Sequence, residues 1–139
     1  MADIPKVLID INILLDVLQM REPFYEASAR LLVLAETGRA KGYIAAHCIT
    51  TLFYLIQKDQ SSAHARASIT SLLQFLEIAP VDQSTIEQAL NLDYGDFEDA
   101  VQMISALQCN AEYLITRNAT DYQPALLPVI QPVDFLGTI

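Results

Sequence analysis

The sequence predicts an α/β domain built around a mostly parallel, doubly wound sheet. Short apolar runs with the length of buried strands alternate with longer segments whose apolar residues recur at helical spacing, almost throughout the chain. A chain of 139 residues with 53% hydrophobic residues can bury the core of one ordinary domain. We therefore expect a single domain over residues 1–139.

The first half of the chain is expected to begin with a buried parallel strand, because its first apolar run is short and continuous. Helical spacing begins at Asn12. Pro23 suits the first turn of a second helix, and Gly38 is a suitable residue to close it. Ser61 or Ser62 is a good cap for a later helix. The predicted elements are a strand at 6–9, helices at 12–19 and 24–37, a strand at 43–46, and helices at 48–58 and 61–76.

The second half continues the alternation and ends in a proline-rich segment. Residues 123–136 contain three prolines, and one short strand is expected there near Val129–Ile130. The preceding elements are a strand at 77–81, helices at 84–92 and 97–109, and a strand at 112–116.

Composition excludes several classes of protein. No apolar run approaches the roughly 18–20 residues of a membrane span, and the first residues do not form a signal peptide, so we expect a cytoplasmic protein. Cys48 and Cys109 stand in apolar surroundings and are expected to be buried thiols without zinc or disulfide roles. The net charge of −9 argues against a broad basic nucleic-acid surface. Any nucleic-acid contact should be local and metal-assisted, and the acidic surface could equally attract a basic partner.

Asp10 follows the first predicted strand directly. In a doubly wound sheet, the functional site lies beyond the carboxyl ends of the strands. Two readings are open for a carboxylate at this position: Asp10 caps the following helix, or it is held there for its charge.

Asp96 and Asp99 stand three residues apart at the start of a predicted helix, so both can project to one side. A capping box would account for Asp96 as the cap. It accounts less well for Asp99, because the apolar residues that follow place this helix start against the core.

A third polar group, Thr116, Arg117, Asn118 and Asp121, follows the last of the four longer strands. Each residue alone could be ordinary turn chemistry. Together the three groups should converge at one sheet edge. Oxygen ligands without histidine or cysteine favour Mg²⁺ or Mn²⁺, and a divalent cation relieves the repulsion between crowded carboxylates.

These segments resemble the PIN-domain family. The matching stretches are "LIDINILLDVL", "DFEDAVQMISAL" and "AEYLITRNATDY", in the expected order over essentially the whole chain, with "PVIQPVDFL" similar to the family's last strand and tail. The resemblance implies a PIN-like three-layer α/β/α fold. It also implies a Mg²⁺- or Mn²⁺-dependent ribonuclease, similar to the VapC-type toxins that are paired with an antitoxin.

The resemblance also implies roles for individual residues. Asp10 matches the first metal ligand and Asn12 its polar companion, while Thr116 matches a threonine that supports the site. Asp99 matches the acid of the "DA" helix, and Asp96 the extra acid of the "DxxDA" subgroup. The residues implied as catalytic are Asp10, Asp99, Asn118 and Asp121, and those implied as metal ligands are Asp10, Asp96, Asp99 and Asp121.

One position departs from the family pattern. A glutamate is usual in the helix after the second strand, and Tyr54 or a neighbour stands there in this chain. Tyrosine is a poor ligand at neutral pH. An alternative function therefore stays open, in which a catalytically weak or inactive PIN-like fold binds RNA or protein.

Other α/β classes with an early aspartate fit less well. Receiver domains and haloacid-dehalogenase-type phosphatases need a late lysine, and no lysine follows Lys58. The resemblance to the PIN-domain family implies an RNA substrate and a cognate antitoxin as partners. The apolar surplus and the segment 68–76, "SITSLLQFL", also lead us to expect a homodimer.

Overall fold

A five-stranded, wholly parallel sheet forms the centre of the computed structural model, which describes residues 4–139. The strand order is β3-β2-β1-β4-β5, so the direction of winding reverses between β1 and β4. The predicted doubly wound sheet is thereby confirmed. The strands are β1 (Lys6–Ile9), β2 (Lys41–Ala45), β3 (Leu76–Ala79), β4 (Tyr113–Ile115) and β5 (Val129–Ile130).

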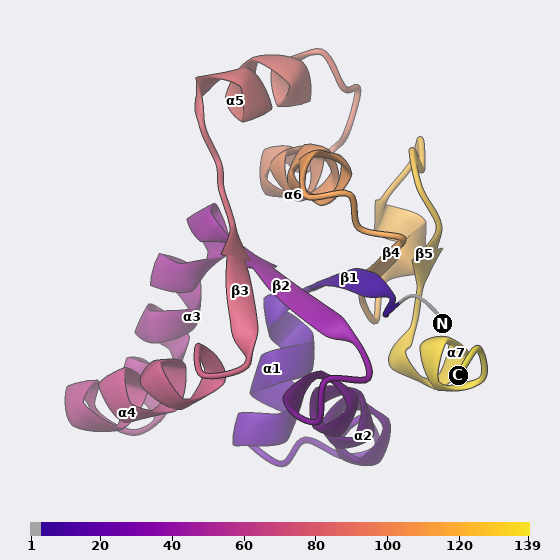
Figure 1. Cartoon of the computed structure of the whole chain (residues 1–139). Coiled ribbons are helices and arrows are strands. Elements are labelled where there is room, and N and C mark those ends of the chain that lie inside the picture. The colour runs from indigo at the N-terminus through magenta and orange to yellow at the C-terminus, as the bar shows by residue number, and fades with distance from the viewer. Residues whose placement is uncertain (1–3) are drawn as a thin grey trace.

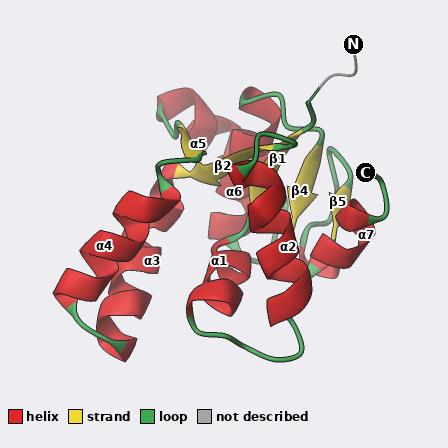
Figure 2. Ribbon diagram, turned by 60° about the horizontal axis from the view of Figure 1, so that its bottom comes forward, coloured by secondary structure: helices red, strands yellow, loops and turns green. Residues whose placement is uncertain are grey.

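Helices cover both faces of the sheet, which gives the three-layer arrangement (Figure 1). The pair α5 and α6 lies on one side, and α1 to α4 lie on the other, as Figure 1 shows. The helices α3 and α4 form a pair at one end of the molecule (Figure 2). None of the helices within residues 4–139 is long and apolar enough to cross a membrane. The helices are α1 (Ile11–Leu18), α2 (Tyr25–Glu36), α3 (Ala46–Asp59), α4 (Ser62–Leu72), α5 (Gln83–Leu90), α6 (Phe97–Gln108) and α7 (Pro132–Leu136).

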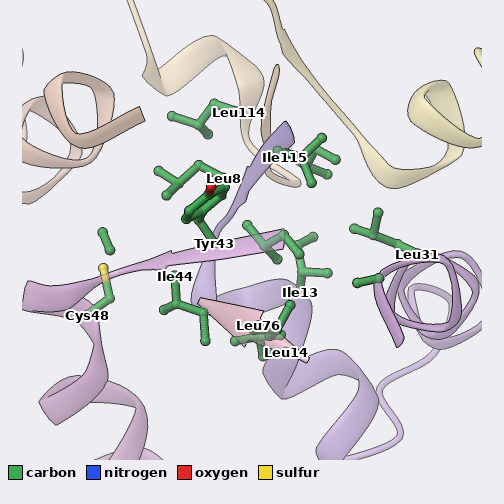
Figure 3. Close-up of a cluster of buried hydrophobic side chains, with 14 of the residues drawn as sticks. Leu8, Ile13, Leu14, Leu31, Tyr43, Ile44, Cys48, Leu76, Leu114 and Ile115 are labelled. Atoms are coloured by element: carbon green, nitrogen blue, oxygen red, sulfur yellow. The ribbon is translucent and has the colours of Figure 1, made fainter. Parts of the chain in front are cut away.

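The core lies between the sheet and its helices, with β1 at its centre. Val7, Leu8 and Ile9 have no exposed surface, as expected for a central parallel strand. Side chains from α1, α2 and the neighbouring strands pack on them in one cluster (Figure 3). A rigid β1 therefore fixes the position of Asp10, the residue that follows it.

Most helix ends agree with the sequence prediction. The hydroxyl of Ser61 accepts a hydrogen bond from the backbone N–H of His64 at 3.0 Å and caps α4. Gly38 follows α2 with φ +79°, a conformation that glycine adopts readily.

The prediction was wrong for the end of the chain, where it gave no helix. Pro132 occupies the first position of α7, where its missing N–H costs nothing. The Asp134 carboxylate accepts a hydrogen bond from the Gln131 N–H at 3.4 Å. A short 3₁₀ helix, η1 (Ala119–Asp121), was also not predicted.

Candidate active site

A pocket of about 240 Å³ lies at the carboxyl edge of the sheet, beside the ends of β1 and β4. These are the two strands between which the winding reverses, and this is where doubly wound folds place their ligands. All seven residues that the sequence predicted for the site line this pocket. The lining residues are Asp10, Ile11, Asn12, Cys48, Asp96, Glu98, Asp99, Gln102, Thr116, Asn118, Asp121 and Tyr122.

Asp10 is both a helix cap and a member of the pocket. Its Oδ1 accepts a hydrogen bond from the Asn12 N–H at 3.4 Å, so it caps α1. Its Oδ2 accepts one from the Thr116 hydroxyl at 2.8 Å. Thr116 is fully buried, and its hydroxyl also accepts the Asn118 N–H at 3.2 Å. The two readings that the sequence left open for Asp10 are therefore compatible.

The start of α6 brings three further carboxylates to the pocket. Asp96 caps the helix by accepting the Glu98 N–H at 2.8 Å, and Asp99 also faces the pocket. Burial and the nearby carboxylates of Asp96, Asp10 and Asp121 raise the pKa of Asp99 to about 6, although a hydrogen bond with Tyr122 opposes the rise. Asp99 therefore lies among other carboxylates, and helix capping alone does not explain why it is there.

The segment after β4 closes the pocket. Asn118 precedes η1, and the Asn118 carbonyl accepts a hydrogen bond from the Asp121 N–H at 3.0 Å. The next residue, Tyr122, is 2% exposed and packs edge-to-face on Tyr94 with ring centroids 6.3 Å apart. Asn118 and Asp121 are held at the pocket by this turn.

Sequence reasoning missed a row of buried polar side chains behind the carboxylates. The Cys48 thiol donates a hydrogen bond to Gln102 Oε1 at 3.3 Å, and Gln102 Nε2 donates one to the Tyr122 hydroxyl oxygen at 2.7 Å. Burial raises the pKa of Cys48 to about 12 and also raises the pKa of Tyr122, so both stay protonated. Glu98 was missed as well. The "DY" pair and Gln102 in an otherwise apolar helix face were the available signals.

Tyr54, which was named at or near the position of the family glutamate, does not line the pocket in the structure. Its side chain is 60% exposed, and it lies more than two turns into α3. Cys48, in the first turn of α3, provides the lining from this helix. The predicted burial is confirmed for Cys48, which also faces the site, whereas Cys109 is only partly buried.

The pocket is strongly negative. Five carboxylates line it, and among its described lining residues there is no lysine, arginine or histidine. Within residues 4–139, no three His, Cys, Asp or Glu side chains lie close enough together to hold one ion between them. Mg²⁺ commonly keeps several waters and uses one or two carboxylates, so Asp10 and Asp99 fit such an ion in number and chemistry.

Comparison with known proteins identifies the family. Residues 6–120 match the family model described as "PIN domain". Ribonuclease VapC1 from Aquifex aeolicus (strain VF5) is 23% identical over 124 residues, which cover 86% of this chain and 85% of that protein.

Several solved structures share the fold at low identity. FitAcB from Neisseria gonorrhoeae has a TM-score of 0.69 at 17% identity and covers 91% of this chain and 98% of its own. VapBC2 from Rickettsia felis, bound to a DNA fragment from its promoter, has a TM-score of 0.64 at 17% identity and covers 91% and 97%. VapC20 from Mycobacterium tuberculosis, described as a sarcin–ricin loop cleaving toxin, has a TM-score of 0.62 at 14% identity and covers 78% and 86%.

Proposed function

The chain belongs to the PIN-domain family, and on this premise we propose that it is a metal-dependent endoribonuclease that acts as the toxin of a toxin–antitoxin pair. The observation that carries the proposal is the pocket in which five carboxylates meet without a lining cation. An RNA phosphate could approach such a surface only if positive charge were supplied there. The relative named Ribonuclease VapC1 supports the choice of RNA as substrate.

The proposed roles follow from position in the pocket. Asp10 and Asp99 would hold a Mg²⁺ or Mn²⁺ ion, and Asp96 and Asp121, which line the same pocket, would reach it through bound water. When bound, the ion would neutralise the scissile phosphate and favour deprotonation of the attacking water. Thr116 keeps the Asp10 carboxylate in place through its 2.8 Å hydrogen bond. Asn12 is a second support for this carboxylate, because its backbone N–H donates a hydrogen bond to Asp10 Oδ1 at 3.4 Å.

The remaining roles concern contact with the substrate and the charge of the pocket. The amide of Asn118 lines the pocket and can donate a hydrogen bond to a phosphate oxygen. Asp99 has a pKa of about 6 in the metal-free fold, so its carboxyl is mostly ionised at neutral pH and can bind a cation. Asp121, in η1, adds a further negative charge to the pocket lining.

A second candidate function is a PIN-like module that binds RNA or protein without cleaving. It is favoured by the thiol of Cys48 in the pocket lining from α3, where the family usually has a glutamate. Fewer acidic ligands would lower the affinity for the metal ion. The two candidates differ in whether bound RNA is cut.

Cleavage of a 5′-labelled single-stranded RNA oligonucleotide distinguishes the two. We expect cutting with Mn²⁺ or Mg²⁺, none with EDTA, and a loss of about 10²-fold or more for Asp99→Asn. Asp93→Asn removes an exposed carboxylate just before α6, outside the pocket lining, and should cut like the wild type. RNA that binds but stays intact under every metal condition would support the binding module instead.

We also propose a cognate antitoxin and a cytoplasmic location. FitAB and VapBC2, whose toxin chains share this fold, were solved as complexes on DNA. A basic segment of a partner would complement the acidic pocket and the net charge of −9. The protein encoded next to this chain, added to the cleavage assay, should inhibit the reaction, and failure to bind would argue against a toxin–antitoxin pair.

A further inference from the structure

Asp16 is a fully buried carboxylate in the middle of α1, outside the pocket. The Arg117 Nε lies 3.3 Å from its Oδ2, and the Ser28 hydroxyl donates a hydrogen bond to the same oxygen at 3.4 Å. Its second oxygen, Oδ1, has no hydrogen-bond partner in the described part of the chain. An apolar helix face thus contains a charge whose main compensation comes from a distant segment.

Arg117 connects this buried charge to the active site. It stands between Thr116 and Asn118, both of which line the pocket. Its own side chain turns the other way, with the guanidinium carbon 4.1 Å from the centre of the Phe24 ring. Consecutive residues of one segment therefore face opposite sides of it.

Two carboxylates of α1 hold this segment. Thr116 donates a hydrogen bond to Asp10, the cap of α1, and Arg117 pairs with Asp16, six residues further along the helix. The Thr116 N–H also donates a hydrogen bond to the Ile130 carbonyl of β5 at 3.0 Å, so the sheet and Asp10 together hold Thr116. Arg117 adds an attachment to α1 at the next residue, where the chain leaves the sheet.

The ion pair is a poor way to gain stability. Asp16 is fully buried and Arg117 is partly buried, so the cost of removing these charges from water offsets much of their attraction. Apolar residues of similar size often stabilise a fold as well or better. Burial also raises the pKa of the Asp16 carboxyl, against the opposing effect of Arg117. The pair adds little stability, but it joins α1 to the segment that lines the pocket. We therefore explain it by its effect on the position of that segment.

We propose that Asp16 and Arg117 are positioning residues that hold the segment Thr116–Asp121, and with it Asn118 and Asp121, against the Asp10 side of the pocket. For metal and RNA this inference rests on the proposed function. Neither Asp16 nor Arg117 is among the residues that line the pocket.

The test separates position from stability. Asp16→Asn, Arg117→Met and the double variant are compared by thermal melts, hydrogen exchange of the 116–122 amides and Mn²⁺ affinity. Arg117→Met leaves a buried carboxylate without its main partner and should lower the Tm by roughly 10 °C or more. The double variant contains no unpaired buried charge and should recover most of that loss.

If the pair has a positioning role, the double variant should recover its thermal stability but neither its exchange protection nor its Mn²⁺ affinity. Its 116–122 amides should still exchange about tenfold faster than in the wild type, and its Mn²⁺ affinity should stay about tenfold weaker. Arg66→Met is the matched control, because Arg66 also lies over an aromatic ring, that of Phe53 at 5.5 Å, but away from the pocket. It should change neither readout.

Two outcomes would overturn the inference. Full recovery of exchange protection and Mn²⁺ affinity in the double variant would reduce the pair to a stabilising contact. Wild-type exchange in Asp16→Asn would show that the segment does not depend on the pair. If the wild type itself bound no Mn²⁺ and cut no RNA, the proposed function would fail, and the exchange data would still decide the positioning role.

Discussion

Asp10 and Asp99 are the residues on which the proposed chemistry depends most, and both could be identified from the sequence. Each stands at the end of a strand or the start of a helix, positions that the alternation of elements defines. Cys48, Gln102 and Tyr122 could not be identified, because their contribution depends on how α3 and α6 dock on the sheet. No local pattern specifies which face of a helix meets a distant turn.

The carboxylate of Asp99 predicts a pH dependence of the metal-free protein. Its pKa is 3.8 in the ordinary case and about 6 in the fold. Because the folded value is higher, the contribution of Asp99 to stability is present below about pH 4 and is lost as the pH rises through about 6. Between about pH 4 and 7, the wild type should therefore lose on the order of 1 kcal/mol relative to Asp99→Asn, allowing for partial exposure of the group.

Metal should reverse this difference. Urea unfolding at several pH values, with and without Mn²⁺, measures both effects, since a ligand that binds the fold stabilises it by mass action. Mn²⁺ should stabilise the wild type and stabilise Asp99→Asn and Asp10→Asn less. If both variants respond to Mn²⁺ as the wild type does, neither carboxylate binds the ion and the metal mechanism is wrong.

At the scale of elements, the sequence was sufficient for the order of strands and helices and less so for their ends. Apolar periodicity located β1 to β4 and α1 to α6 within a few residues, because each buries one face or both. The exception is α7. Only a short strand was predicted in this proline-rich segment, although Pro132 at the first helical position favours a helix.

The missed helix α7 is an integral part of the core. Phe135 is fully buried, its ring centre lies 5.8 Å from that of Tyr113 in β4, and α7 packs along α2. Phe135→Ala should cost about 3–5 kcal/mol, seen in urea as a lower midpoint with an unchanged slope. Val133→Ala, in the same helix at 60% exposure, should stay within about 0.5 kcal/mol. Equal small losses in both variants would mean that α7 is dispensable.

At the scale of the whole molecule, the expected homodimer needs a different argument from the one the sequence supplied. Within segment 68–76, Leu72 and Leu76 are buried, Ile69 and Phe75 are partly buried, and Leu73 is 39% exposed. Most apolar side chains of this segment are therefore already covered by other parts of the same chain and do not offer a surface to a second copy. Apolar side chains are also exposed elsewhere, among them Met20 and Leu90, both 68% exposed, and the homodimer stays a prediction.

Charge decides how such a dimer should respond to salt. Two copies with a net charge of −9 repel each other, and salt shortens the range of that repulsion from about 30 Å at 0.01 M to about 8 Å at 0.15 M. An apolar contact is not weakened by the same change. Dimerisation should therefore strengthen as NaCl increases, whereas a dimer held by ion pairs should weaken. Sedimentation velocity across micromolar concentrations at both salt levels measures this, and a monomer under every condition would contradict the prediction.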